Sequence, residues 1–211
     1  MTAPRPNVVY IITDQQRADH IGCHTDAPLR TPNLDRLAAD GISFRRFYCN
    51  NPICTPSRAA ILTGRTPRSN RVWDNGCPLP ETETTLPAVL REHGYATHAV
   101  GKLHLTPWWD RSATYYESTS YWREAKHDDA PEPYAGFEAA ELCLGHIDPT
   151  VGHYGRWLRR EHPDVAAHWK DYLSPHPSGA PGAQVWTLPP ACHANAWIAD
   201  RACAFLDRAA E

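Results

Sequence analysis

The chain has 211 residues, of which 42% are hydrophobic and 21% are charged, and its formal net charge at pH 7 is −3. This length supports one substantial hydrophobic core, and the slightly acidic balance argues against partners such as nucleic acid or an anionic membrane. No apolar run is long enough to span a membrane, no signal-peptide core follows Met1, and the seven cysteines are an odd, scattered set. We therefore expect a cytoplasmic protein without a disulfide framework.

The first hundred residues alternate between strand and helix patterns. The continuous β-branched run NVVYIIT at 7–13 predicts a strand buried on both faces, and YATHAV at 95–100 predicts a second core strand. Helices are predicted at 31–41 and 84–94, each with a capping threonine at its start and a glycine at its end. This alternation predicts an α/β fold with a mostly parallel sheet flanked by helices on both faces.

A short extended piece at 42–48 precedes another predicted helix, in the segment CTPSRAAILTGR. Here Thr55 suits the N-cap, Pro56 suits the first helical position and Gly64 suits the C-cap. Cys54 is then expected directly before a helix N-terminus, where unpaired N–H groups and the helix dipole favour negative charge. The position therefore suits an anionic nucleophile or an anionic substrate.

The character of the chain changes over residues 107–190. Ten of the twenty prolines and six of the eight tryptophans fall in this region, which predicts long irregular structure with short helices, one of them around 152–160. A closing helix is predicted at 193–210. Its apolar stripe consists of Trp197, Ile198, Ala202, Phe205 and Leu206.

Polar side chains follow both predicted core strands. Asp14 and Gln15 come directly after the first strand, and Lys102 and His104 come after the second. Ligands of open α/β sheets bind beyond the carboxyl ends of the strands, so we expect all four side chains at that edge. The oxygens of the first pair suit Ca²⁺ or Mg²⁺. The second pair, two residues apart, would point to one side of an extended backbone.

With Cys54 and Arg58, these two pairs form a candidate site for an anionic ester, because cations neutralise developing charge and an imidazole passes a proton. Simpler explanations stay open: the first pair can begin a turn, the second can be solvated, and a lone cysteine is often a small buried hydrophobe. A cysteine-phosphatase loop is disfavoured, since three residues rather than five separate Cys54 from Arg58. A zinc site at Cys49 and Cys54 lacks a close Cys-x-x-Cys pair.

CTPSRAAILTGR resembles the sulfatase signature, which is Cys-x-Pro-Ser-Arg followed by x4-Thr-Gly. PNVVYIITDQQRAD, TPNLDRLAADGISFRRFY and GYATHAVGKLHL resemble other N-terminal blocks of this family in the same order, and HANAWIADRACAFLDRA resembles a later helix. The resemblance implies an alkaline-phosphatase-like α/β fold, incomplete at the C-terminus. Residues 1–211 would be the N-terminal portion of the catalytic domain, with 1–106 as its core βα part, 107–190 as an irregular part and 191–211 as a helix.

The resemblance also implies that a separate formylglycine-generating enzyme reads the Cys-x-Pro-x-Arg pattern and converts Cys54 into formylglycine (3-oxoalanine). One hydroxyl of the hydrated aldehyde then attacks the sulfur of a small-molecule or carbohydrate sulfate ester and expels the alcohol. The second hydroxyl loses its proton, and the hemiacetal collapses to the aldehyde and releases sulfate. A divalent metal, with Ca²⁺ as first candidate and Mg²⁺ or Mn²⁺ as alternatives, would be held by Asp14, Gln15 and residue 54. The residues implied around the formylglycine, the sulfate and the leaving group are Arg58, Lys102, His104 and Asn75.

Two departures from the family pattern leave alternatives open. Many members have a second aspartate where this chain has Gln15, and an Asp-Gln pair also resembles phosphonate monoester and phosphodiester hydrolases of the same superfamily. The family's remaining metal ligands lie later in its fold than Glu211. The chain is therefore expected to be part of a longer enzyme, or a catalytically inactive truncated remnant, and to be inactive and poorly stable alone.

Overall fold

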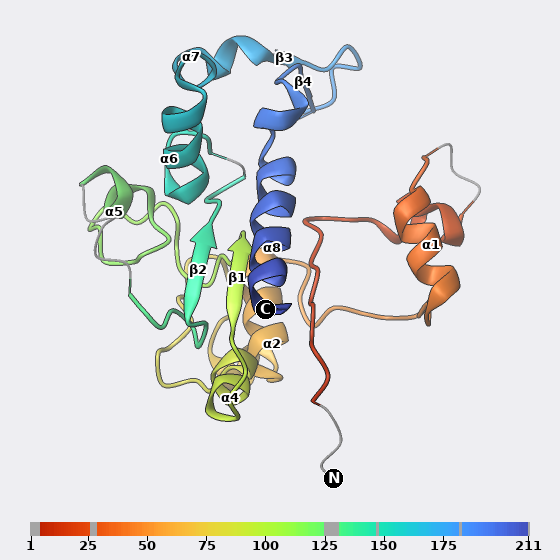
Figure 1. Cartoon of the computed structure of the whole chain (residues 1–211), viewed down its shortest axis with the longest axis vertical. Helices are drawn as coiled ribbons and strands as arrows, with labels where there is room; N and C mark the ends of the chain where they lie inside the picture. Colours follow the sequence, from red (N-terminus) through yellow and green to blue (C-terminus); the bar gives the residue numbers. More distant parts are fainter. Residues whose placement is uncertain (1–4, 26–28, 125–130, 147, 182, 211) are drawn as a thin grey trace. The chain divides into compact units, whose positions relative to one another are not determined.

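The computed structural model of the chain describes residues 5–25, 29–124, 131–146, 148–181 and 183–210 (Figure 1). The chain forms two compact units, residues 1–48 and residues 49–211. All seven cysteines are free thiols. Among the described residues, no helix combines the length and the apolar character needed to cross a membrane.

The described residues of the first unit form two 3₁₀ turns and one helix. The turns are η1 (Ala18–His20) and η2 (Gly22–His24), and α1 (Pro32–Asp40) confirms the helix predicted at 31–41. The Thr31 hydroxyl does not cap α1; it donates to the Asp35 carboxylate and accepts the Gly22 N–H, which ties α1 to η2.

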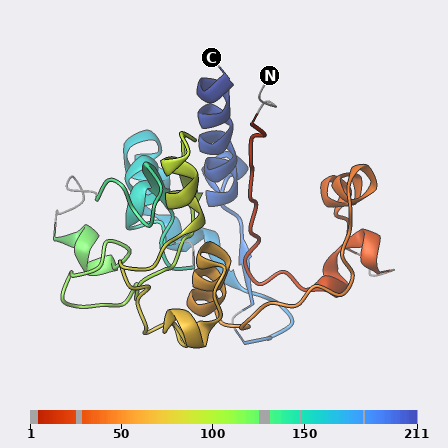
Figure 2. The same ribbon diagram turned by 90° about the horizontal axis from the view of Figure 1, so that it is seen from below.

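The prediction of a strand at 7–13 is wrong. These residues form a trace without helix or strand, drawn in red in Figures 1 and 2, and Val8 to Ile12 are between 40% and 80% exposed. The extended piece predicted at 42–48 is also irregular and exposed, with a turn at its centre. A β-branched run becomes a strand only when a neighbouring strand accepts its hydrogen bonds, and the described part of this unit has no strand.

The second unit contains seven helices among its described residues. The predictions at 84–94, 152–160 and 193–210 are confirmed, each within three residues at either end. The helices are α2 (Cys54–Thr63), α3 (Pro67–Asn70), α4 (Leu86–Glu92), α5 (Thr119–Arg123), α6 (Gly152–Glu161), α7 (Pro163–Ala167) and α8 (Ala194–Ala210). The described residues of this unit also form the 3₁₀ turns η4 (Trp169–Tyr172) and η5 (Pro190–Cys192).

The described residues of the second unit also form two strand pairs. Strand β1 (His98–Gly101) runs parallel to β2 (Ala139–Leu142), and β3 (Leu173–Pro175) pairs antiparallel with β4 (Gln184–Trp186). The strand predicted at 95–100 therefore exists but begins three residues later, and the parallel α/β pairing is confirmed. The prediction of long irregular structure with short helices over 107–190 missed β2, β3 and β4, because three- or four-residue strands depend on their partner rather than on a local pattern.

Helices pack directly on the parallel pair. Helix α8 lies beside β1 (Figure 1). The Phe205 ring of α8 stacks on His98 of β1, with 4.6 Å between the ring centroids. Gly101 has a φ of 101°, and a Cβ placed there would come within 3.1 Å of the Ile198 side chain, so this close approach requires glycine. Helices α6 and α8 share a core that includes Tyr154 and Trp197. This packing holds the end of β1, where the candidate site begins.

Candidate active site

Cys54 is the first residue of α2, whereas the sequence places it just before the helix. Ile53 is the N-cap residue, and Thr55, predicted as the cap, is fully buried inside the first turn. The backbone N–H of Thr55 donates to Oδ1 of Asn75 at 3.0 Å, so a residue twenty positions away does the capping. Gly64 ends the helix in a left-handed conformation, as expected. Cys54 thus lies at the positive end of the helix dipole.

Two cationic side chains lie at this helix end. Nζ of Lys102 is 3.7 Å from Sγ of Cys54. Arg58, one turn further along α2, is 7% exposed, and its Nη1 donates to the Lys102 carbonyl oxygen at 2.5 Å. The structure therefore brings together three of the residues that the sequence suggested, and Asn75 joins them through the backbone of Thr55.

Lys102 and His104 do not lie on an extended strand, so the prediction that an extended backbone directs both side chains to one side is wrong. Strand β1 ends at Gly101, and His104 has a φ of 54°. A left-handed conformation at a residue with a Cβ costs roughly 1–2 kcal/mol and needs support from its surroundings. We call residues 102–105 the 102–105 turn. His104 is 4% exposed, so its imidazole is buried.

The support for this turn comes from Glu117, a residue that the sequence analysis missed. Its carboxylate is 2% exposed and accepts the backbone N–H of His104 and, at 2.7 Å, that of Leu105. The Tyr134 hydroxyl donates to the same carboxylate at 2.8 Å. Glu117 falls in the proline- and tryptophan-rich region, where no spacing or motif distinguishes it from other acidic residues.

Opposing effects act on the Glu117 carboxyl. Burial is the largest effect and raises the pKa of this carboxyl above its usual value, whereas the hydrogen bonds from Leu105, Tyr134 and His104 and the positive charge of Arg58 lower it. All three hydrogen-bonding partners donate to the Glu117 oxygens, so each of these bonds favours the carboxylate form. Burial raises the pKa of the Tyr134 hydroxyl well above its usual range, which keeps that group a donor.

Asp14 and Gln15 lie in the first unit, after the irregular run rather than after a strand. Both are exposed, and Gln15 has a φ of 54°. Their carboxylate and amide oxygens have the hard-donor chemistry that Ca²⁺ or Mg²⁺ prefers, so they fit such a cation as two of its six or more ligands. Within the described ranges, no cluster of three or more His, Cys, Asp or Glu side chains forms a metal site.

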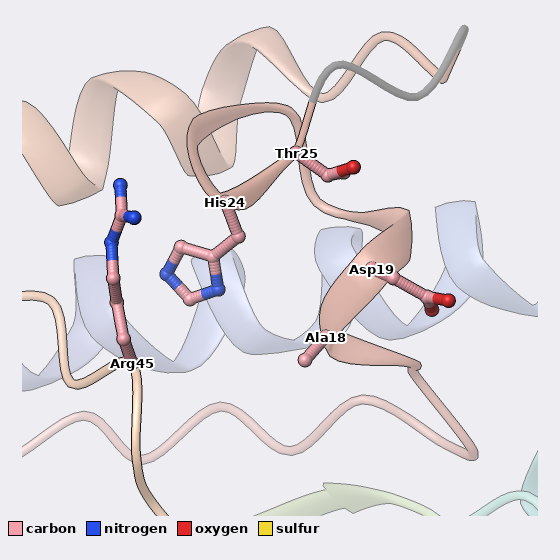
Figure 3. Close-up of a pocket in the computed structure, with 5 residues that line it drawn as sticks. All are labelled: Ala18, Asp19, His24, Thr25 and Arg45. Atoms are coloured by element: carbon pink, nitrogen blue, oxygen red, sulfur yellow. The ribbon is translucent and has the colours of Figure 1, made fainter.

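The first unit also has a pocket of its own, of about 230 Å³, which contains none of the predicted site residues. Figure 3 shows that Asp19 points away from His24 and Arg45, so the polar groups do not converge. Asp19 instead pairs with Arg17 at 2.6 Å, which lowers the pKa of its carboxyl well below the usual range. The pocket is lined by Ala18, Asp19, His24, Thr25 and Arg45.

Comparison with known proteins gives consistent matches. The Sulfatase family model matches residues 6–147. The chain is 36% identical over 160 residues to the ulvan-active sulfatase of Formosa agariphila, a match that covers 72% of this chain and 29% of that protein. It is 38% identical over 117 residues to human N-acetylgalactosamine-6-sulfatase, covering 49% of this chain and 22% of that protein.

Among solved structures, the phosphonate monoester hydrolase of Agrobacterium radiobacter superposes with a TM-score of 0.68 at 27% identity, covering 96% of this chain and 38% of that one. This likeness confirms the alkaline-phosphatase-like α/β fold class. The matched segments span between about a fifth and a third of the length of the curated relatives.

Proposed function

The chain belongs to the sulfatase family, and from this premise we propose that the protein hydrolyses sulfate esters. The observation that carries the proposal is the 3.7 Å approach of the Lys102 ammonium to Cys54 at the first residue of α2. A cation and a helix N-terminus both favour negative charge at this point. Both would stabilise the negative charge of a sulfate group bound at residue 54.

We propose that Cys54 is converted to formylglycine by a formylglycine-generating enzyme, on the strength of the CTPSR segment at 54–58. Once formed, this group supplies the nucleophilic hydroxyl and the means of releasing sulfate. The Lys102 ammonium stabilises negative charge that spreads over the sulfate oxygens, and the buried His104 imidazole passes a proton to the leaving oxygen. Arg58 keeps the 102–105 turn against α2 through the Lys102 carbonyl.

Asp14 and Gln15 are proposed as ligands of a divalent metal, with Ca²⁺ as first candidate and Mg²⁺ or Mn²⁺ as alternatives. A divalent cation would supply charge neutralisation in ester hydrolysis. The support is the chemistry of the two adjacent oxygen donors and the family pattern. Asn75 is proposed to contact the substrate through its amide nitrogen, because its oxygen is used by the Thr55 N–H.

The substrate class that we propose is a carbohydrate sulfate ester. One relative is an N-acetylgalactosamine-6-sulfatase and another is an ulvan-active sulfatase, which favours a sugar as the leaving alcohol. Aryl sulfates are convenient probes of the same reaction, since the transferred group is identical.

A second candidate is hydrolysis of phosphonate monoesters or phosphodiesters. Gln15 in place of a second aspartate and the 0.68 TM-score against a phosphonate monoester hydrolase favour it. The test compares p-nitrophenyl sulfate with p-nitrophenyl phenylphosphonate, using the complete gene product co-expressed with a formylglycine-generating enzyme and Cys54→Ala as the blank. A higher kcat/KM for the sulfate supports the first proposal, and a higher value for the phosphonate replaces it with the second.

A further inference from the structure

The 102–105 turn is held from two sides through its main chain. On one side, the Arg58 guanidinium donates to the Lys102 carbonyl oxygen. On the other, the Glu117 carboxylate accepts the N–H groups of His104 and Leu105. These bonds fix the backbone of the turn without using the side chains of Lys102 and His104. The directions of these two side chains therefore depend on Arg58 and Glu117, which do not themselves carry out the proposed chemistry.

Burial of the Glu117 carboxylate is energetically unfavourable, since a carboxylate buried this deeply loses its hydration. Three donors and the nearby charge of Arg58 offset part of that loss. Two successive backbone N–H groups that converge on one anion form a nest, and a nest requires a left-handed residue such as His104. The carboxylate and the unusual backbone of the turn therefore stabilise each other.

We propose that Glu117 is a positioning residue of the sulfate site, whose carboxylate holds the 102–105 turn in the conformation that directs Lys102 to residue 54 and sets the His104 imidazole. This inference rests on the proposed function. Glu117 acts through the turn and does not touch the substrate. Without the carboxylate, the left-handed conformation at His104 loses its main support, and the turn relaxes.

The decisive substitution is Glu117→Gln, made in the complete gene product. Glutamine keeps the size of the side chain but offers one acceptor oxygen, and its NH₂ group then faces one of the two backbone donors. Tyr134→Phe is the matched control, because it removes the third donor to the same carboxylate and leaves both bonds to the turn. Each variant thus loses one buried hydrogen bond at the same carboxylate.

We expect Glu117→Gln to lower kcat for p-nitrophenyl sulfate by about 10- to 100-fold with a much smaller change in KM, and Tyr134→Phe to stay near the wild-type kcat. Hydrogen–deuterium exchange supplies a readout that needs no turnover. Amides of the 102–105 turn should exchange faster in Glu117→Gln than in Tyr134→Phe, while those of α6 and α8 keep their protection.

Wild-type kcat and wild-type exchange of the turn in Glu117→Gln would overturn the proposal, as would equal losses in the two variants. If Glu117→Gln does not fold, Glu117→Asp takes its place: it keeps both oxygens but withdraws them by one methylene, and an unchanged kcat would again overturn the proposal. A wild-type protein that cleaves neither sulfate nor phosphonate esters would refute the proposed function. The exchange comparison would then decide alone whether Glu117 holds the turn.

Discussion

Lys102 and Cys54 are 48 residues apart in the sequence, yet 3.7 Å separates the ammonium nitrogen of one from the sulfur of the other. Helix α2 presents Cys54 at its first residue, and β1 ends one residue before Lys102. The contact therefore joins a helix N-terminus to a strand C-terminus. Both the cation and the helix end favour an anion between them.

Cys54 should carry formylglycine after co-expression with a formylglycine-generating enzyme, because CTPSR has the pattern that this enzyme reads. Trypsin cleavage after Arg46 and Arg58 places Cys49 and Cys54 in one peptide, FYCNNPICTPSR. Fragment-ion mass spectrometry should locate the aldehyde at Cys54 and an unmodified thiol at Cys49, which serves as the internal control. An unmodified Cys54, in cells where a known sulfatase is converted, would contradict this prediction.

Lys102→Ala should lower kcat on an aryl sulfate by about 10²-fold or more, as for a lost preorganised donor, and Arg58→Ala should lower it by a similar factor because the 102–105 turn loses its bond to α2. Their stabilities should differ. Lys102→Ala keeps the carbonyl that Arg58 binds, whereas Arg58→Ala removes a buried charge near Glu117 and should cost about 2 kcal/mol or more of unfolding free energy. Urea unfolding beside steady-state kinetics checks both. Wild-type turnover in either variant would refute its assigned role.

Asn75 should have two separable roles, in helix capping and in substrate contact. Asn75→Ala removes the acceptor of the Thr55 N–H and should cost about 0.5–2 kcal/mol of stability, as for other lost helix caps. Asn75→Asp keeps the acceptor, so its stability should remain near wild type, while KM for the anionic ester rises because a donor is replaced by a negative charge. An Asn75→Asp variant with unchanged KM would leave only the capping role.

Stability of the chain should fall below pH 6.5. Burial, followed by the charge of Arg156, lowers the pKa of His153 to about 4, and its Nδ1 accepts the Leu142 N–H at 2.9 Å. Between the unfolded pKa near 6.5 and the folded value, the unfolded chain binds the extra proton, so unfolding free energy falls as pH falls, by about 3 kcal/mol in total. This stability is fully present above pH 6.5.

The measurement for His153 is the urea midpoint across this pH range for wild type and His153→Gln, with His168→Gln at an exposed position as the reference substitution. His153→Gln should show a shallower dependence on pH than the other two proteins. Identical slopes in all three would show that another group controls the acid sensitivity.

Removal of divalent metal with EDTA should abolish ester hydrolysis, and Ca²⁺, Mg²⁺ or Mn²⁺ should restore it. Because affinity for Ca²⁺ rises with the number of charged ligands, Asp14→Asn should raise the Ca²⁺ concentration needed for half-maximal activity and Gln15→Asp should lower it. The Ca²⁺ titration of the three proteins is the measurement. Full activity in EDTA would exclude the proposed metal.

Part of the candidate site could be predicted from the sequence, because its motif residues are close together and their local structure is helical. The CTPSR segment identified Cys54 and Arg58, and the strand-end position pointed to Lys102. The role of Glu117 could not be predicted, since its partners are backbone N–H groups thirteen and twelve residues away. These groups come together only when the turn folds. A buried carboxylate that binds main chain has no motif of its own.

The sequence by itself determined the family and the helices, whose backbone hydrogen bonds join residues four apart; α1, α6 and α8 begin and end close to their predicted positions. Only the tertiary structure decided the strands and the supports of the site. The run at 7–13 has strand composition and forms no strand, whereas β2 forms from four unremarkable residues because β1 lies beside it. Strand hydrogen bonds need a remote partner, and local sequence does not specify where that partner lies.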